Sequence, residues 1–263
     1  MEGGDAVDQR PLGHTGLSVS HVGWGTVKIG RNTSVKFPEA FELPTETDAI
    51  AIVHGMIDLG ITLIDTAPAY GLAEARLGKA LADRRADVLL CTKVGETFDN
   101  GQCRHDFSGD AARASLMKSL RELGTDHVDI LLVHSDGNDL AIQADTDLVE
   151  TLEEFRRQGM TRTIGFSGKT PEGARAALAW ADVIMCEYTL GNRSHEAVIT
   201  EAAQAGVGVL LKKVLGSGHL DAAAALEFVL RDAPIAPLIS SAVIGSLSVE
   251  RMRANGEAPQ SRG

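Results

Sequence analysis

The sequence is poor in cysteine and in basic charge. It has 263 residues and only three cysteines, which are widely spaced and form no CxxC motif. An odd, sparse set of cysteines argues against a disulfide framework and favours a reducing compartment, so we expect a cytoplasmic protein. The 25 lysines and arginines are outnumbered by 36 aspartates and glutamates, giving a formal net charge of −11. This balance disfavours nucleic acid and anionic membranes as partners.

Several familiar signals are also missing. No apolar run approaches the roughly 20 residues of a membrane span, so no membrane partner is expected. No GxGxxG follows a strand pattern and no P-loop occurs, which argues against a Rossmann domain. The spacing of Cys103, His105 and His134 matches no zinc pattern, so no metal is expected. Tyrosine is scarce, since Tyr70 and Tyr188 are the only two.

What the sequence does contain is a recurring apolar run followed by a helical segment. Near-continuous apolar character is typical of strands buried on both faces of a parallel sheet. Eight such runs occur, at residues 21–26, 61–65, 88–93, 128–134, 161–167, 182–187, 207–213 and 241–245.

Helical patterns with start or stop signals separate these runs. A capping hydroxyl and a first-turn proline begin a helix at Thr170-Pro171, and glycines close others. Eight strand–helix units in this length predict a (β/α)8 TIM barrel rather than a doubly wound sheet. The remaining helical patterns occupy residues 45–60, 108–124, 146–159 and 194–206.

We expect one domain over residues 1–263. The ordered barrel is predicted to span about residues 10–255, and residues 256–263 read as a polar tail. Residues 9–20 read as a β-hairpin with its turn at His14-Thr15-Gly16, and this hairpin would close the bottom of the barrel.

Polar residues end several of the apolar runs. Asp65 ends the second, Lys93 the third and His134 the fourth, and Tyr70 follows the second on its loop. In a barrel of this type the chemistry sits at the carboxyl ends of the strands, so these four side chains are predicted to share one rim. Taken singly, each also has a structural interpretation, such as a turn cap, a solvated lysine or a core histidine.

Together the four residues suggest carbonyl chemistry. A nearby ammonium favours a phenolate, so Lys93 is expected to lower the pKa of Tyr70 from its usual value of about 10. A carboxylate beside the lysine would keep it charged, and the imidazole of His134 could hydrogen-bond a substrate oxygen. A carbonyl between Tyr70 and His134 would then be polarised and protonated, with hydride from a nicotinamide cofactor.

These motifs resemble those of the aldo-keto reductase family, in family order from about residue 10 to 255. The matching stretches are RPLGHTGLSVSHVGWGT, LIDTAPAYGLAEARLGKAL, LLCTKVG, SLRELGTDHVDILLVH, IGFS and VIGSLSVERMRAN. The resemblance implies Tyr70 as general acid/base, Asp65 and Lys93 as its tuning pair, and His134 as the carbonyl-orienting group. It also implies NADPH, or NADH in some members, bound in extended form without a Rossmann domain.

The resemblance further implies a set of cofactor-binding positions. The sequence departs from the family at Gly168, Met185, Lys212 and Gly245, where Asn, Gln, Tyr and Lys are usual. We therefore expect Lys212 or Lys213 to supply the phosphate charge that Gly245 lacks. The cofactor positions are Gly25, Thr26, Ser167, Met185, Lys212, Lys213, Leu215, Ser217, Ser246, Arg251 and Asn255.

Two further features have open interpretations. Trp24 either lines the substrate mouth or packs in the core, and residues 96–109 either shape the pocket or form a solvated loop. The leading function is NAD(P)H-dependent reduction of small aldehydes or ketones. The alternatives are a cofactor-binding regulatory barrel subunit, or a non-redox lyase or isomerase that uses Lys93. The sequence does not indicate an oligomeric state.

Overall fold

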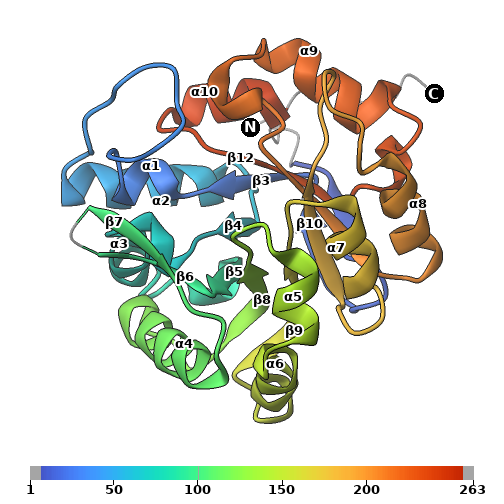
Figure 1. The fold of residues 1–263 in the computed structure, drawn as a ribbon. Coiled ribbons are helices and arrows are strands. Elements are labelled where there is room, and N and C mark those ends of the chain that lie inside the picture. Colours follow the sequence, from blue (N-terminus) through green and yellow to red (C-terminus); the bar gives the residue numbers. More distant parts are fainter. Residues whose placement is uncertain (1–6, 100, 257–263) are drawn as a thin grey trace.

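Eight parallel strands close into a barrel at the centre of the molecule (Figure 1). The computed structural model describes residues 7–99 and 101–256. The strands follow one another around the barrel in sequence order, and β12 pairs with β3 to close it. The predicted TIM barrel is confirmed. Its strands are β3 (Val22–Gly25), β4 (Leu63–Asp65), β5 (Leu89–Val94), β8 (Val128–His134), β9 (Thr161–Ser167), β10 (Val183–Glu187), β11 (Gly208–Lys212) and β12 (Ser241–Ile244).

Helices connect the strands and surround the barrel (Figure 1). The predicted cap at Thr170 is present, and the hydroxyls of Thr45 and Ser108 likewise accept hydrogen bonds from the first-turn amides of their helices. The α-helices are α1 (Val27–Gly30), α2 (Glu46–Asp58), α3 (Ala73–Ala80), α4 (Gly109–Leu123), α5 (Asp139–Ala144), α6 (Leu148–Arg157), α7 (Pro171–Ala177), α8 (Glu196–Gln204), α9 (Ala222–Glu227) and α10 (Val249–Gly256).

Some elements were not predicted from the sequence. Helices α3, α5 and α9 have eight residues or fewer, which is too short for a clear helical period. Five single-turn elements were also missed for this reason, namely η1 (Pro68–Tyr70), η2 (Arg85–Asp87), η3 (Gly216–Gly218), η4 (Phe228–Asp232) and η5 (Ala236–Leu238).

An N-terminal hairpin closes one end of the barrel, as predicted. Its strands β1 (Gln9–Pro11) and β2 (Ser18–Ser20) pair antiparallel. Three apolar side chains of this hairpin, Leu12, Leu17 and Val19, belong to the same buried cluster as the residues that fill the barrel interior. The hairpin therefore seals the end of the barrel opposite the strand carboxyl ends.

Strand alternation decides which side chains reach the inside. On β4, Leu63 belongs to the interior cluster and Ile64 to the outer layer against the helices, so Asp65 returns to the interior. On β3 the same alternation turns Trp24 outward. Trp24 is fully buried in the outer layer, and its indole nitrogen donates a hydrogen bond to the carbonyl oxygen of Ser246 at 2.9 Å. Trp24 therefore packs in the core and does not line the substrate mouth.

A second hairpin follows β5 within the segment read from the sequence as a connection. Its strands β6 (Glu96–Asp99) and β7 (Gln102–His105) pair antiparallel, with Glu96 opposite His105. The guanidinium carbon of Arg31 lies 3.8 Å from the centre of the Phe98 ring and so fastens the hairpin to the barrel rim.

The sequence-based expectations also concern membrane-spanning helices and the C-terminal tail. No helix among the described residues has both the length and the apolar character needed to cross a bilayer. Gly256 is the last residue of α10, and the rest of the predicted polar tail, residues 257–263, lies outside the described part of the chain.

Candidate active site

Two opposite charges meet at the carboxyl ends of β4 and β5. The Nζ atom of Lys93 lies 2.6 Å from Oδ1 of Asp65 and donates a second hydrogen bond, 2.8 Å long, to the carbonyl oxygen of Thr66. Both side chains are buried, with 1% of Lys93 and 5% of Asp65 exposed. Burying an unpaired ammonium is costly, so the carboxylate is what keeps Lys93 charged and oriented at this position.

Tyr70 is held above this pair by a close contact between backbones. It ends the single turn η1, in which Pro68 occupies the first position. A Cβ atom on Gly30 would lie only 2.0 Å from the carbonyl oxygen of Tyr70, so α1 packs directly against this turn. Gly71 follows with a φ of +63°, a conformation that favours glycine. The phenol oxygen lies 3.4 Å from Nζ of Lys93.

Opposing influences set the pKa of Tyr70. Burial raises it and the Lys93 ammonium lowers it, and the net result is a pKa of about 12. The expectation that the pKa of Tyr70 is lowered is therefore wrong. Lys93 does lower this pKa, as expected, but burial raises it by more. Burial lowers the pKa of Lys93, but the neighbouring groups, Asp65 first among them, together outweigh burial and raise it. At neutral pH the site thus holds a protonated phenol beside a permanent ammonium.

His134 ends β8 and faces Tyr70 edge-on, with ring centres 6.2 Å apart. Its buried Nδ1 atom lies 2.9 Å from Oε2 of Glu96, within ion-pair distance although the geometry departs from that of a hydrogen bond. Sequence reasoning missed Glu96. The sequence left open whether residues 96–109 shape the pocket, and Glu96, Cys103 and His105 do line it. The contact with His134, however, depends on the β6–β7 hairpin.

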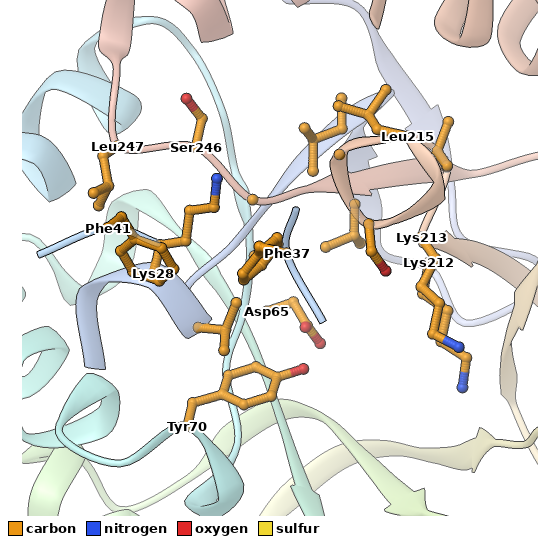
Figure 2. Close-up of a pocket in the computed structure, with 18 of the residues that line it drawn as sticks. Lys28, Phe37, Phe41, Asp65, Tyr70, Lys212, Lys213, Leu215, Ser246 and Leu247 are labelled. Atoms are coloured by element: carbon orange, nitrogen blue, oxygen red, sulfur yellow. The ribbon is translucent and has the colours of Figure 1, made fainter. Parts of the chain in front are cut away.

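A cavity of about 1090 Å³ opens above these residues. Figure 2 shows Tyr70 and Asp65 along one part of its wall, with Ser246 and Leu247 across from them. Eleven residues expected from the sequence line the cavity together, namely Gly25, Asp65, Tyr70, His134, Lys212, Lys213, Leu215, Ser217, Ser246, Arg251 and Asn255.

Other expected residues do not line the cavity. Lys93 is buried beneath it, in contact with Asp65 and Tyr70. Thr26 is fully buried, and its hydroxyl donates a hydrogen bond to the backbone oxygen of Asp65. Ser167 is also fully buried, and Met185 belongs to the apolar cluster inside the barrel. The structure therefore places these last three residues behind or below the cavity wall.

The comparisons with known proteins agree with this geometry. The model described as "Aldo/keto reductase family" matches residues 21–232. The chain belongs to the aldo-keto reductase family. Among curated proteins it is 34% identical to L-galactose dehydrogenase of Arabidopsis thaliana, over 81% of this chain and 67% of that protein. It is 26% identical to D-threo-aldose 1-dehydrogenase of Pseudomonas sp., over 78% and 68% of the two chains.

Solved aldo-keto reductases have the same architecture. A structure assigned to the family from Pseudomonas aeruginosa aligns with a TM-score of 0.87 and 40% identity, over 97% of both chains. The holo form of an aldo-keto reductase from Bacillus halodurans aligns with a TM-score of 0.78 and 27% identity, over 96% of this chain and 90% of the other. Family membership makes the chain an oxidoreductase that uses a nicotinamide cofactor on small carbonyl compounds.

This aldo-keto reductase has an unusual lysine on its rim. Nζ of Lys212 donates hydrogen bonds to Oγ of Ser167 at 2.9 Å and to the carbonyl oxygen of Gly168 at 2.7 Å. Burial, reinforced by the Lys213 charge, lowers the pKa of Lys212 to about 8. Lys213 forms an ion pair with Glu187 at 3.0 Å. Both lysines are therefore held by protein groups.

A different pair of cations lies across the cavity. Figure 2 shows the Lys28 ammonium directed toward Ser246, on the opposite side from Lys212 and Lys213. Nζ of Lys28 lies 4.5 Å from the centre of the Phe37 ring and 5.6 Å from that of Phe41. Burial, together with the positive charge of Arg251, lowers the pKa of Lys28. Sequence reasoning missed Lys28 and both phenylalanines, which have no strand-end signal.

The described residues, 7–99 and 101–256, contain no cluster of histidine, cysteine, aspartate or glutamate suited to a metal ion. Cys103 and His105 lie near Glu96 on the β6–β7 hairpin. Their contacts belong to that hairpin and to the wall of the cavity.

Proposed function

We propose that this aldo-keto reductase reduces small aldehydes or ketones to alcohols with NADPH or NADH, and catalyses the reverse oxidation. The observation that carries the proposal is the connected set of Asp65, Lys93 and Tyr70 beside His134 at the floor of one cavity. The relatives named as L-galactose and D-threo-aldose dehydrogenases support a hydroxyl–carbonyl interconversion on a sugar-like compound.

Each side chain has a defined task in this proposal. A substrate carbonyl oxygen sits between Tyr70 and His134; the phenol donates a hydrogen bond to it, and the imidazole does so when the ring is protonated. As the carbonyl carbon is reduced, the C=O π electrons move to the oxygen, which takes the proton from the phenol of Tyr70. The Lys93 ammonium stabilises the phenolate left behind, and Asp65 keeps that ammonium in place.

The cavity suits a long dinucleotide. It extends from Tyr70 to Ser246 and Arg251, and the part near Ser246 carries the positive charges of Lys28 and Arg251. Guanidinium and ammonium groups bind phosphate oxygens well, so this region fits the anionic adenosine part. When bound, the reduced nicotinamide supplies the hydride.

The experiment compares a panel of aldehydes, ketones and alcohols with NADPH and NADH side by side. Tyr70→Phe keeps the ring and removes the proton donor, so we expect turnover to fall about 100-fold or more. Cofactor affinity, measured by quenching of protein fluorescence, should stay within about twofold of the parent. Parent-like turnover in Tyr70→Phe would contradict the role of the phenol.

The alternatives from the sequence receive less support. A Schiff base on Lys93 needs an accessible neutral amine, whereas this ammonium is buried and its pKa is raised by Asp65 after the opposing effect of burial. Borohydride trapping of substrate on Lys93 would reverse this conclusion. A purely regulatory role does not require the Lys93–Tyr70 arrangement, and steady turnover in the panel separates the two.

A further inference from the structure

The β6–β7 hairpin places one carboxylate against the ring of His134. Glu96 lines the cavity, and its side chain is 16% exposed. Its Oε2 atom lies 2.9 Å from Nδ1 of His134, and its Oε1 atom lies 3.8 Å from Nε2 of His105 across the hairpin. Gly95, directly before Glu96, has a φ of +101°, and a Cβ there would lie 2.6 Å from the Phe107 ring, so the entry to the hairpin requires glycine.

The two ring nitrogens of His134 have different surroundings. Nδ1 is buried next to the carboxylate, whereas His134 lines the cavity, which leaves Nε2 as the ring nitrogen available to a ligand. An ionised carboxylate only accepts hydrogen bonds. A lone pair on Nδ1 would face the negative carboxylate at 2.9 Å and be repelled, so a neutral imidazole keeps its single hydrogen on Nδ1 and its lone pair on Nε2.

We propose that Glu96 is a positioning residue that fixes the Nδ1–H tautomer of neutral His134, so that Nε2 accepts a hydrogen bond from a substrate hydroxyl. A carbonyl oxygen offers no hydrogen and can bind Nε2 only when the ring is an imidazolium. The neutral site therefore selects an alcohol or hemiacetal hydroxyl, and the protonated site selects a carbonyl. This inference rests on the proposed function and defines which form of the substrate the site binds.

The charges around the ring decide which state prevails. Burial lowers the pKa of His134, contact with Glu96 raises it, and the Lys93 and Lys212 ammonium groups lower it, with a net lowering. The phenol of Tyr70 faces the ring and is uncharged at neutral pH. Burial raises the pKa of Glu96, but its contacts with His134, Cys103 and His105 together outweigh burial and lower that pKa to about 2, so the carboxylate stays ionised. At neutral pH the structure thus favours the hydroxyl-binding state.

The first test reads the tautomer directly. Nitrogen-15 NMR of the labelled full chain, followed across pH, distinguishes a protonated ring nitrogen from one with a lone pair. We expect the lone pair of neutral His134 on Nε2 in the parent protein, with and without bound cofactor. A lone pair on Nδ1 would overturn the inference whether or not the protein turns over any substrate.

The second test uses Glu96→Gln, which keeps the shape of the side chain but can donate as well as accept a hydrogen bond. Neutral His134 is then free to carry its hydrogen on Nε2 and to bind carbonyls. In the parent, kcat/KM for reduction should fall about tenfold per pH unit above the pKa of His134, because the imidazolium fraction falls by that factor. In Glu96→Gln this fall should disappear, so the variant should exceed the parent at high pH.

The matched control is Thr97→Val, since Thr97 lies on the same hairpin and is exposed. It should keep the parent pH profile. Equal profiles in the parent and Glu96→Gln would contradict the positioning role. A parent without turnover on any carbonyl or alcohol would instead contradict the proposed function, and the NMR result would still decide the tautomer.

Discussion

At the scale of single residues, burial and one or two neighbouring charges set the protonation of the whole site. Tyr70 stays protonated because burial outweighs the Lys93 charge, and Lys93 stays charged because its neighbours, Asp65 first among them, together outweigh burial. The sequence predicted these three residues because each lies at or just after a strand end. It could not predict the balance between burial and charge, which depends on distances in the folded chain.

A buried carboxyl outside the active site gives a prediction about stability. Both oxygens of Glu74 accept hydrogen bonds, one from the hydroxyl of Thr92 at 2.6 Å and one from that of Ser119 at 3.1 Å. Burial nevertheless raises the pKa of Glu74 to about 7. The folded protein therefore holds this proton at pH values where the unfolded chain has released it, so folding is favoured below the unfolded pKa.

The sign follows from this difference in bound protons. As pH rises from about 4.5 to about 7, the contribution of Glu74 to the free energy of unfolding should fall, by on the order of 3 kcal/mol in total. Urea unfolding across this range measures the fall, and Glu74→Gln should remove it. Glu42→Gln, at an exposed residue in the segment before α2, is the control and should keep the parent slope. Identical slopes in the parent and Glu74→Gln would refute the assignment.

At the scale of elements, strand ends position Asp65, Lys93 and His134, whereas the turn η1 positions Tyr70 and the β6–β7 hairpin positions Glu96. The eight strands and the capped helices were predictable because their periodicity and caps are local. The contact between α1 and η1 was not, since it joins Gly30 to the backbone of Tyr70 across 40 residues. The β6–β7 hairpin also escaped prediction, because its polar residues show no apolar alternation.

Gly30→Ala tests the element contact. The added methyl group would lie 2.0 Å from the carbonyl oxygen of Tyr70 and 2.3 Å from the amide nitrogen of Ala73, so the turn has to move. A displacement of about 1 Å at a reacting group can cost roughly 100-fold in rate, so we expect kcat to fall at least tenfold. Steady-state kinetics with a good substrate measures the change.

The control for this variant is Gly191→Ala, where an added Cβ meets no atom within 4 Å. It should retain parent kcat. Circular dichroism should show both variants folded. Parent kcat in Gly30→Ala would mean that the backbone contact does not place the phenol.

At the scale of the whole molecule, closure of the barrel brings the two ends of the chain together. β12 pairs with β3, so Arg251, which follows β12, comes close enough to Lys28, which follows β3, to affect its pKa. This suggests a different source of phosphate charge from the one expected at Lys212 or Lys213. Those two lysines lie across the cavity, and Lys213 is paired with Glu187.

Lys28→Met tests which cation serves the cofactor phosphate. Loss of a charged hydrogen bond costs about 1.5–3 kcal/mol, so we expect the Kd for NADPH to rise roughly tenfold or more. The Kd for NADH should rise less if Lys28 serves the extra phosphate of NADPH. Fluorescence titration measures both constants. Lys213→Met is the comparison variant, and a larger loss of NADPH affinity there than in Lys28→Met would favour the expectation from the sequence.

The sequence by itself determined the barrel, the bottom hairpin and the order of Asp65, Tyr70, Lys93 and His134, because strand burial and strand-end polarity are local patterns. Only the tertiary structure decided that Glu96 meets His134 and that Lys28 lies near Arg251. It also decided that Trp24 packs outward. These outcomes depend on hairpin folding, strand parity and barrel closure, which join residues far apart in the chain.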